Sequence, residues 1–245
     1  MSTRGRRFWV VTAATVLTLA ITASLGRWQL DRAAQKEALQ AKVDQRSGLP
    51  ALNEQSLLAS SDLQAEIHRS VRLRGQWLPE ASVFLDNRQM NGRTGFFLVT
   101  PLRLSGSDQA VLVQRGWTPR DFTDRSRIPV VDTPAGEVVI DGRLAPPPAK
   151  LYELGEPTPG PIRQNIDVAT MAEASGLRLL DASVMQTGDT EDGLLREWPR
   201  VNAGVQKHYG YAVQWFALFA LAALLYLWFQ ILSPRRKPKS HGPAA

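Results

Sequence analysis

The histidine at position 208 and two aromatic residues that follow it form the most chemically suggestive pattern in this sequence. His208, Tyr211 and Trp215 are spaced at i, i+3 and i+7, which places them on one face of a helix. An imidazole there could bind a metal ion or a haem iron against an aromatic wall. Tyr and Trp are also common anchors at a membrane interface, where a nearby histidine is only solvated. Both interpretations remain open at this point.

The helix that would carry these three residues is long and apolar. No charged residue occurs from Tyr209 to Pro234, a run of 26 residues. As a helix this run is about 39 Å long, and a hydrocarbon core is about 30 Å thick. The run therefore predicts a transmembrane helix over residues 209–232, with His208 at its wet end.

A second apolar run lies near the N-terminus. Residues 8–26 are uncharged for 19 positions, which is just long enough to span a bilayer. The alternative is a cleaved signal peptide. We expect a retained span, because the run is long for a signal and Ala23-Ser24-Leu25 offers no clean cleavage site. This helix is rich in small polar residues that suit packing against the second span. They are Thr12, Thr15, Thr18 and Thr22.

The net charge of +6 is concentrated at the two ends of the chain. Residues 1–32 and 233–245 each carry +4, so the middle is slightly acidic. A basic groove for nucleic acid is therefore not indicated. Under the positive-inside rule, residues 1–7 and 233–245 are cytoplasmic and residues 27–207 lie across the membrane. With no amphipathic transit peptide ahead of the first span, we expect a bacterial inner membrane and a periplasmic central domain.

The residue inventory excludes several kinds of chemistry. There is no cysteine, so disulfides, thiolate metal sites and thiol catalysis are absent from this chain. The three histidines are scattered, and we expect His68 to be exposed on the polar face of a strand and His241 to lie in a tail. The Asp and Glu residues show no paired arrangement for acid–base work. We therefore predict that the protein is not an enzyme.

The central region predicts an α+β or barrel-like domain in which most strands are antiparallel. Helical character continues past residue 26 and stops at Ser47-Gly48-Leu49-Pro50. Alternating patterns and turn residues then mark a series of strands, and residues 166–175 indicate a short helix. The predicted strands cover residues 66–78, 81–88, 95–104, 110–117, 138–144, 177–187 and 200–202.

Several of these stretches, taken in order, resemble the surfeit locus protein 1 family of cytochrome c oxidase assembly factors. The stretches are Gly26 to Arg32, Arg69 to Gly75, Leu85 to Arg88, Gly95 to Leu102, Val111 to Trp117, and the series His208, Tyr211, Ala212, Gln214 and Trp215. Each is weak alone, but the ordered set between two apolar runs is fairly specific. The resemblance extends from residue 26 to about residue 230. The chain departs from the family at Lys207, where the family usually has Asn.

The resemblance implies a role in inserting haem a into the oxidase catalytic subunit. It implies that His208 is a ligand of the haem iron, with Trp28, Tyr211 and Trp215 as aromatic walls. Lys207 and Arg27 lie at the level expected for the haem carboxylates. The implied partners are the catalytic subunit, haem a synthase and membrane lipid.

Two other functions compete with that implication. The protein could be a membrane-anchored scaffold that stabilises an oxidase assembly intermediate, with His208 only anchoring the helix. It could instead be a membrane enzyme acting on lipid or haem, which would require a catalytic constellation that the sequence does not show. For the motif at Arg115 and Gly116, we expect a structural role: a buried ion pair and a tight backbone position.

Overall fold

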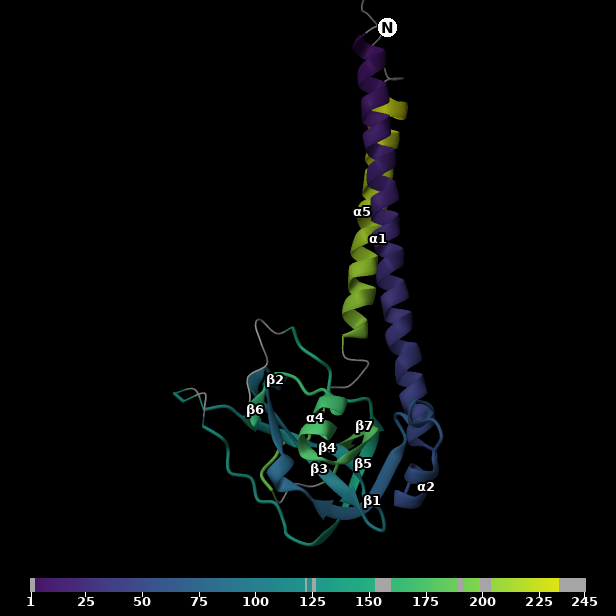
Figure 1. Cartoon of the computed structure of the whole chain (residues 1–245). Coiled ribbons are helices and arrows are strands. Elements are labelled where there is room, and N and C mark those ends of the chain that lie inside the picture. Colours follow the sequence, from purple (N-terminus) through teal and green to yellow (C-terminus); the bar gives the residue numbers. More distant parts are fainter. Residues whose placement is uncertain are drawn as a thin grey trace, which may run out of the picture. The chain divides into compact units, whose positions relative to one another are not determined.

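The computed structural model describes residues 3–121, 123–124, 127–152, 160–188, 192–198 and 204–233. It divides into two compact units (Figure 1). One comprises residues 1–40 with 201–245, and the other comprises residues 41–200. The predicted strand at 200–202 and the tail histidine lie outside the described residues.

The first unit is a pair of long helices, α1 (Thr3–Ser47) and α5 (Val205–Tyr226), and α5 continues into a π-helical turn, η2 (Leu227–Leu232). By length and composition, both helices could cross a membrane. The predicted helix stop is confirmed, because α1 ends at Ser47 and the amide of Gly48 donates to the carbonyl of Asp44 at 3.2 Å. The two apolar runs therefore form two long helices, as predicted.

The two helices run side by side (Figure 1) and meet along seams of small and polar residues. Positions on α1 recur at alternating intervals of three and four, which is the spacing of a left-handed coiled coil. They are Thr12, Thr15, Leu19, Thr22, Gly26, Gln29 and Ala33. The more buried positions of α5 recur in the same way. They are Val205, His208, Ala212, Trp215, Ala222 and Tyr226.

Small side chains let the helix backbones come close, as is typical of membrane helices. A Cβ atom on Gly26 would lie 2.8 Å from the ring of Phe216, so a larger residue there requires that ring to move. Near the other end, the hydroxyls of Thr12 and Tyr226 are 2.9 Å apart. The prediction that the threonine-rich helix packs against the second span is confirmed at Thr12. Thr18 is exposed, and its hydroxyl donates to the carbonyl of Ala14.

The second unit is built on a sheet that closes into a barrel. The strands of the ring follow the order β1-β5-β7-β4-β3, and β1 pairs with β3 to close it. Only β4 and β7 are parallel within the ring. The bounds are β1 Ser70–Trp77, β3 Arg93–Leu104, β4 Gln109–Pro119, β5 Glu137–Ala145 and β7 Arg178–Gln186. The predicted α+β, mostly antiparallel barrel is confirmed.

The barrel interior holds the main core, because inward residues alternate with outward ones along each strand. In β1, Val71, Leu73 and Trp77 are buried and the intervening positions face out. They pack with residues of the other strands, such as Leu102 and Val184.

Smaller elements cover the barrel. Strand β2 (Val83–Met90) extends the sheet beside β3, and β6 (Ile162–Arg163) pairs with β2 in parallel. Helix α4 (Val168–Ser175) packs Met171 against a second cluster that includes Leu85. Three short elements were not predicted, since each is too brief to produce a periodic pattern. They are α2 (Glu54–Ala59), α3 (Leu63–Glu66) and β6.

The environment predicted for His68 was wrong. Strand β1 begins at Ser70, and His68 precedes it in a turn with φ 79°. Its amide donates to the carbonyl of Leu144 at 2.8 Å, and the residue is half-buried. Burial lowers the pKa of the imidazole, and the cations Arg143, Lys42 and Arg46 lower it further. The predicted strand began at residue 66, before β1, because the turn after α3 also contains an apolar residue that continues the alternating pattern.

Candidate functional site

His208 lies in the first turn of α5, on the face that meets α1. Its Nδ1 atom is 2.8 Å from the Oε1 atom of Gln29. Gln29 is buried in the seam, and His208 is half-buried. A long helix places each of them at a repeat position, so their separation is set by the packing of the two helices rather than by a loop.

This hydrogen bond involves one particular ring nitrogen of His208. An amide oxygen can only accept, so Nδ1 carries the proton and donates it to Gln29. The neutral ring then has a lone pair on Nε2. Histidine ligands of metals typically donate their other ring N–H in this way, which orients the ring and raises its basicity. The Nδ1 side of His208 is thus taken up by Gln29, which leaves Nε2 as its other ring nitrogen.

The aromatic residues predicted to surround His208 are not all on the same face. Trp215 lies two turns further along α5 and is half-buried on the seam. Tyr211 is 52% exposed and Trp28 is 50% exposed. The guanidinium of Arg32 lies over the ring of Trp28, 5.6 Å from its centroid. The structure thus brings His208 and Trp215 to the helix–helix face and leaves the other two rings outside it.

Further polar groups gather at this end of the helix pair. The hydroxyl of Tyr209 donates to Glu37 at 2.9 Å, a second hydrogen bond between α5 and α1. Lys207 and Arg27, the cations predicted at this level, are both exposed. Gln29 was not predicted as a site residue, although it belongs to the Gly26–Arg32 stretch. Its position in the three–four spacing of α1 was the signal that could have identified it.

His208 is the one histidine among the described residues of the helix pair. Within the described ranges, no group of three or more His, Cys, Asp or Glu residues could hold a metal ion. A bare ion would need several ligands. A haem iron carries four ligands of its own and needs one axial residue. The donor set therefore fits a haem better than a free metal ion.

Arg115 and Gly116 in β4 have a structural role, as predicted. Arg115 is 2% exposed, and its guanidinium contacts Asp192 at 3.3 Å and lies 4.9 Å from the centroid of Trp77. Burial lowers the pKa of Arg115, and Asp192 opposes that effect. At Gly116 a Cβ atom would lie 2.7 Å from the Cβ of Leu194. A side chain at position 116 would therefore prevent β4 from packing this closely against Leu194.

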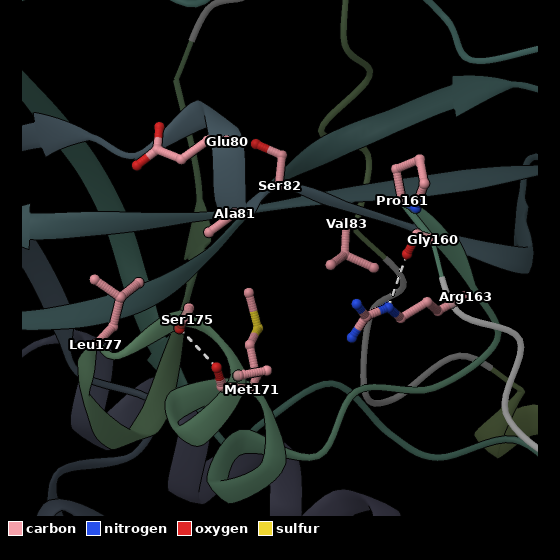
Figure 2. A pocket seen from close by; sticks show the side chains of 11 residues that line it. Glu80, Ala81, Ser82, Val83, Gly160, Pro161, Arg163, Met171, Ser175 and Leu177 are labelled. Atoms are coloured by element: carbon pink, nitrogen blue, oxygen red, sulfur yellow. Dashed lines mark hydrogen bonds between the residues drawn. The ribbon is translucent and has the colours of Figure 1, made fainter.

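The barrel unit has a pocket of about 380 Å³ between η1 (Pro79–Ala81), β6 and α4. Figure 2 shows Met171 on its floor and the side chains of Glu80 and Arg163 at opposite sides. The Nε of Arg163 donates to the carbonyl of Gly160 at 2.8 Å, and Ser175 donates to Met171 at 2.6 Å. Arg163 and Ser175 thus bind nearby backbone carbonyls, and the hydroxyl of Ser82 pairs with that of Thr100 at 3.0 Å.

These features define a class of protein: a pair of membrane-type helices in sequence before and after an α+β barrel, with a single histidine supported across the helices. The sequence matches the SURF1 family over residues 16–220, a range that includes most of both helices and the entire barrel. The chain belongs to the SURF1 family.

Individual relatives agree with this assignment. A SURF1-like protein of Rickettsia felis is 34% identical over 115 residues, 46% of either chain. A second, from Rickettsia prowazekii, is 24% identical over 221 residues, 86% of this chain and 85% of the relative. The cytochrome oxidase assembly protein SHY1 of Saccharomyces cerevisiae is 27% identical over 157 residues, 62% of this chain and 40% of the yeast protein. The chain thus spans about half the length of the Rickettsia felis relative and less of the yeast one.

Proposed function

We propose that this protein is a non-catalytic assembly factor for cytochrome oxidase. The observation that carries the proposal is the family match across residues 16–220, together with the yeast relative whose name describes cytochrome oxidase assembly. The helices α1 and α5 anchor the factor in a bacterial inner membrane. The basic residues near both ends support cytoplasmic termini and a periplasmic barrel under the positive-inside rule.

The finer part of the proposal is that the cargo is haem a. The Nδ1–H of His208 is held by Gln29, which supports an Nε2 lone pair suited to one axial ligand. Trp215 on the seam and the exposed rings of Trp28 and Tyr211 supply aromatic surface at this end of the helices. Exposed Arg27 and Lys207 provide positive charge for the haem carboxylates. The haem then passes from haem a synthase to the catalytic subunit of the oxidase.

A single protein ligand suits transfer better than storage. One axial bond is weaker than a two-histidine site, so a receiving subunit with two ligands can take the haem. In this role Gln29 orients the imidazole and Arg27 or Lys207 positions the carboxylates. The haem itself supplies its redox chemistry only after it reaches the oxidase.

The second candidate is a scaffold that stabilises an oxidase assembly intermediate without binding haem. The same hydrogen bond supports it, because His208 and Gln29 join the two helices whether or not a ligand is present. In that role the barrel holds the partner and His208 contributes only to helix pairing.

The visible absorption spectrum of the detergent-purified full chain, co-expressed with haem a synthesis, distinguishes these roles. We expect a Soret band and a red-shifted α band in the wild type that disappear in His208→Ala. The matched control is Tyr209→Phe, which removes the neighbouring interhelical hydrogen bond to Glu37 and keeps the imidazole. A colourless wild type would contradict haem binding and leave the scaffold role as the explanation. Haem retained in His208→Ala would mean that another residue binds the haem iron.

The assembly role is tested separately in cells. Deletion of the gene should reduce assembled cytochrome oxidase, measured from its haem a absorbance in membranes, and the wild-type gene should restore it. If oxidase content is unchanged by deletion, the assembly role is wrong, whatever the purified protein binds.

A further inference from the structure

A hollow lies between α1 and α5 at the end of the helix pair opposite His208. Its volume is about 420 Å³. On α1 its lining includes Val11, Ala14 and Thr18, and on α5 and η2 it includes Ala222 and Phe229. The residues of α1 that line it are small or β-branched, so the two helices leave apolar space between them.

The polar atoms around the hollow are largely satisfied by the helices themselves. Thr15 and Thr18 donate their hydroxyls to carbonyls four residues earlier, those of Val11 and Ala14. The hydroxyl of Tyr226 is paired with Thr12. What remains is a surface of methyl groups and the rings of Tyr226 and Phe229, which is suited to a hydrocarbon chain.

The outer end of the hollow has a different character. Gln230, in the π-helical turn, lines it and is half-buried. Trp9 and Trp228, on the two helices at this level, are exposed, as expected of rings in the headgroup layer. Helical turns with the π pattern are frequent at functional sites, because the extra residue displaces side chains from the regular ladder.

Positive charge lies directly beyond this end. Arg7 precedes Val11 by one turn and Ala14 by two, so it lies on the α1 face that lines the hollow. Arg6 is in the same relation to Val10. Both arginines are exposed. An apolar slot that opens toward guanidinium groups matches one kind of molecule: an amphiphile with a phosphate head and hydrocarbon tails.

We propose that this hollow is a binding site for an anionic phospholipid. An acyl chain occupies the space between Ala14 and Ala222, and the phosphate lies at Arg6 and Arg7. A zwitterionic lipid would fill the apolar part equally well but would gain less from the arginines. The site is independent of His208 and of any haem bound there, since it is built from the other end of the helices.

The test is native mass spectrometry of the full chain in detergent, titrated with phosphatidylglycerol or with phosphatidylcholine of the same chain length. We expect one phosphatidylglycerol to be retained in preference to phosphatidylcholine. In Arg7→Gln the preference should fall by about fivefold, the factor that one basic residue contributes beside an anionic headgroup. The charge control is Arg103→Gln, an exposed arginine on β3 that should leave the preference unchanged.

The apolar part is tested by filling the hollow. In Ala14→Leu we expect retention of both lipids to fall, while Ala13→Leu, an exposed neighbour that does not line the hollow, should behave as the wild type. Circular dichroism verifies that helical content is equal in all variants. Equal retention of the two lipids by the wild type would overturn the proposal. So would equal behaviour of the two leucine variants.

Discussion

The Nδ1 atom of His208 and the Oε1 atom of Gln29 lie 2.8 Å apart across the two long helices. The two residues are far apart in the sequence, so their hydrogen bond depends on the packing of α1 against α5. It fixes the imidazole tautomer because the amide oxygen can only accept. A change at position 29 therefore alters the chemistry of position 208 without removing its side chain.

We expect Gln29→Leu to release the tautomer of His208. In the wild type, ¹⁵N chemical shifts of labelled histidine should show the proton on Nδ1, and in the variant they should show a mixture. If haem is bound, its affinity should fall by about 10- to 100-fold, the usual effect of losing a supporting partner of a ligand. A wild-type spectrum with the proton on Nε2 would contradict this prediction.

Replacement of Gly26 should separate the helices. In Gly26→Leu the new side chain meets the ring of Phe216, since even a Cβ would be 2.8 Å away. We expect a loss of about 1–3 kcal/mol in stability, the range for overpacking. Thermal unfolding in detergent measures it.

The control for that change is Gly210→Leu on α5, where a Cβ atom would have no neighbour within 4 Å. It should have little effect on unfolding. The double variant Gly26→Leu with Phe216→Ala should recover part of the loss, because the clashing ring is gone. No recovery would mean that the ring is not what limits helix approach.

In the barrel, Asp192→Asn should be strongly destabilising. It leaves Arg115 buried without its carboxylate and also removes the 2.6 Å contact to Arg196. Breaking a buried ion pair from one side costs about 3–5 kcal/mol. The matched control is Asp141→Asn, whose pair with Arg72 is exposed and contributes about 0–1 kcal/mol. Chemical unfolding of the two variants should differ clearly, and similar values would contradict the buried role.

His68 should make stability depend on pH. Burial and three nearby cations lower its pKa below 6.5 in the folded state. As pH falls through 6.5, the unfolded chain takes up a proton that the folded chain resists, so stability is full above this pH and declines below it. We expect His68→Gln to flatten this decline in unfolding measurements between pH 7 and the folded-state pKa. An unchanged slope would assign the dependence to other groups.

The absence of cysteine makes membrane topology directly measurable. A single cysteine at Val130, which is fully exposed on the barrel unit, should react with an impermeant maleimide in cells whose outer membrane has been permeabilised. A cysteine at Arg6 should react only after the inner membrane is opened. The reverse pattern would place the barrel in the cytoplasm and would contradict the proposed orientation.

The sequence predicts the elements of this protein better than their pairing. The apolar runs, the stop at Gly48 and the turn at Asn91-Gly92 follow from local composition, and both turn residues have positive φ. The closure of β1 onto β3 and the parallel pairing of β4 with β7 connect distant segments, and no local pattern specifies them. Short elements such as α3 are stabilised by tertiary contacts rather than by periodicity.

The site shows the same division. His208 could be selected from sequence because it is a lone imidazole at the end of an apolar run. Its partner could not be selected from one helix, because Gln29 acquires its role only when the seams of α1 and α5 are in register. Tyr211 and Trp215 are spaced to share one face of α5. In the structure, however, Trp215 is half-buried while Tyr211 is exposed.

The position of β7 between β5 and β4 affects how the chain is made. β7 is the last strand of the ring to be synthesised, so the edges of β5 and β4 that pair with it stay unpaired until then. At ~5–20 residues per second of synthesis, the wait after β4 is on the order of several seconds. During that time the exposed edges can pair wrongly. The barrel therefore closes late in synthesis, when β7 pairs with both β5 and β4.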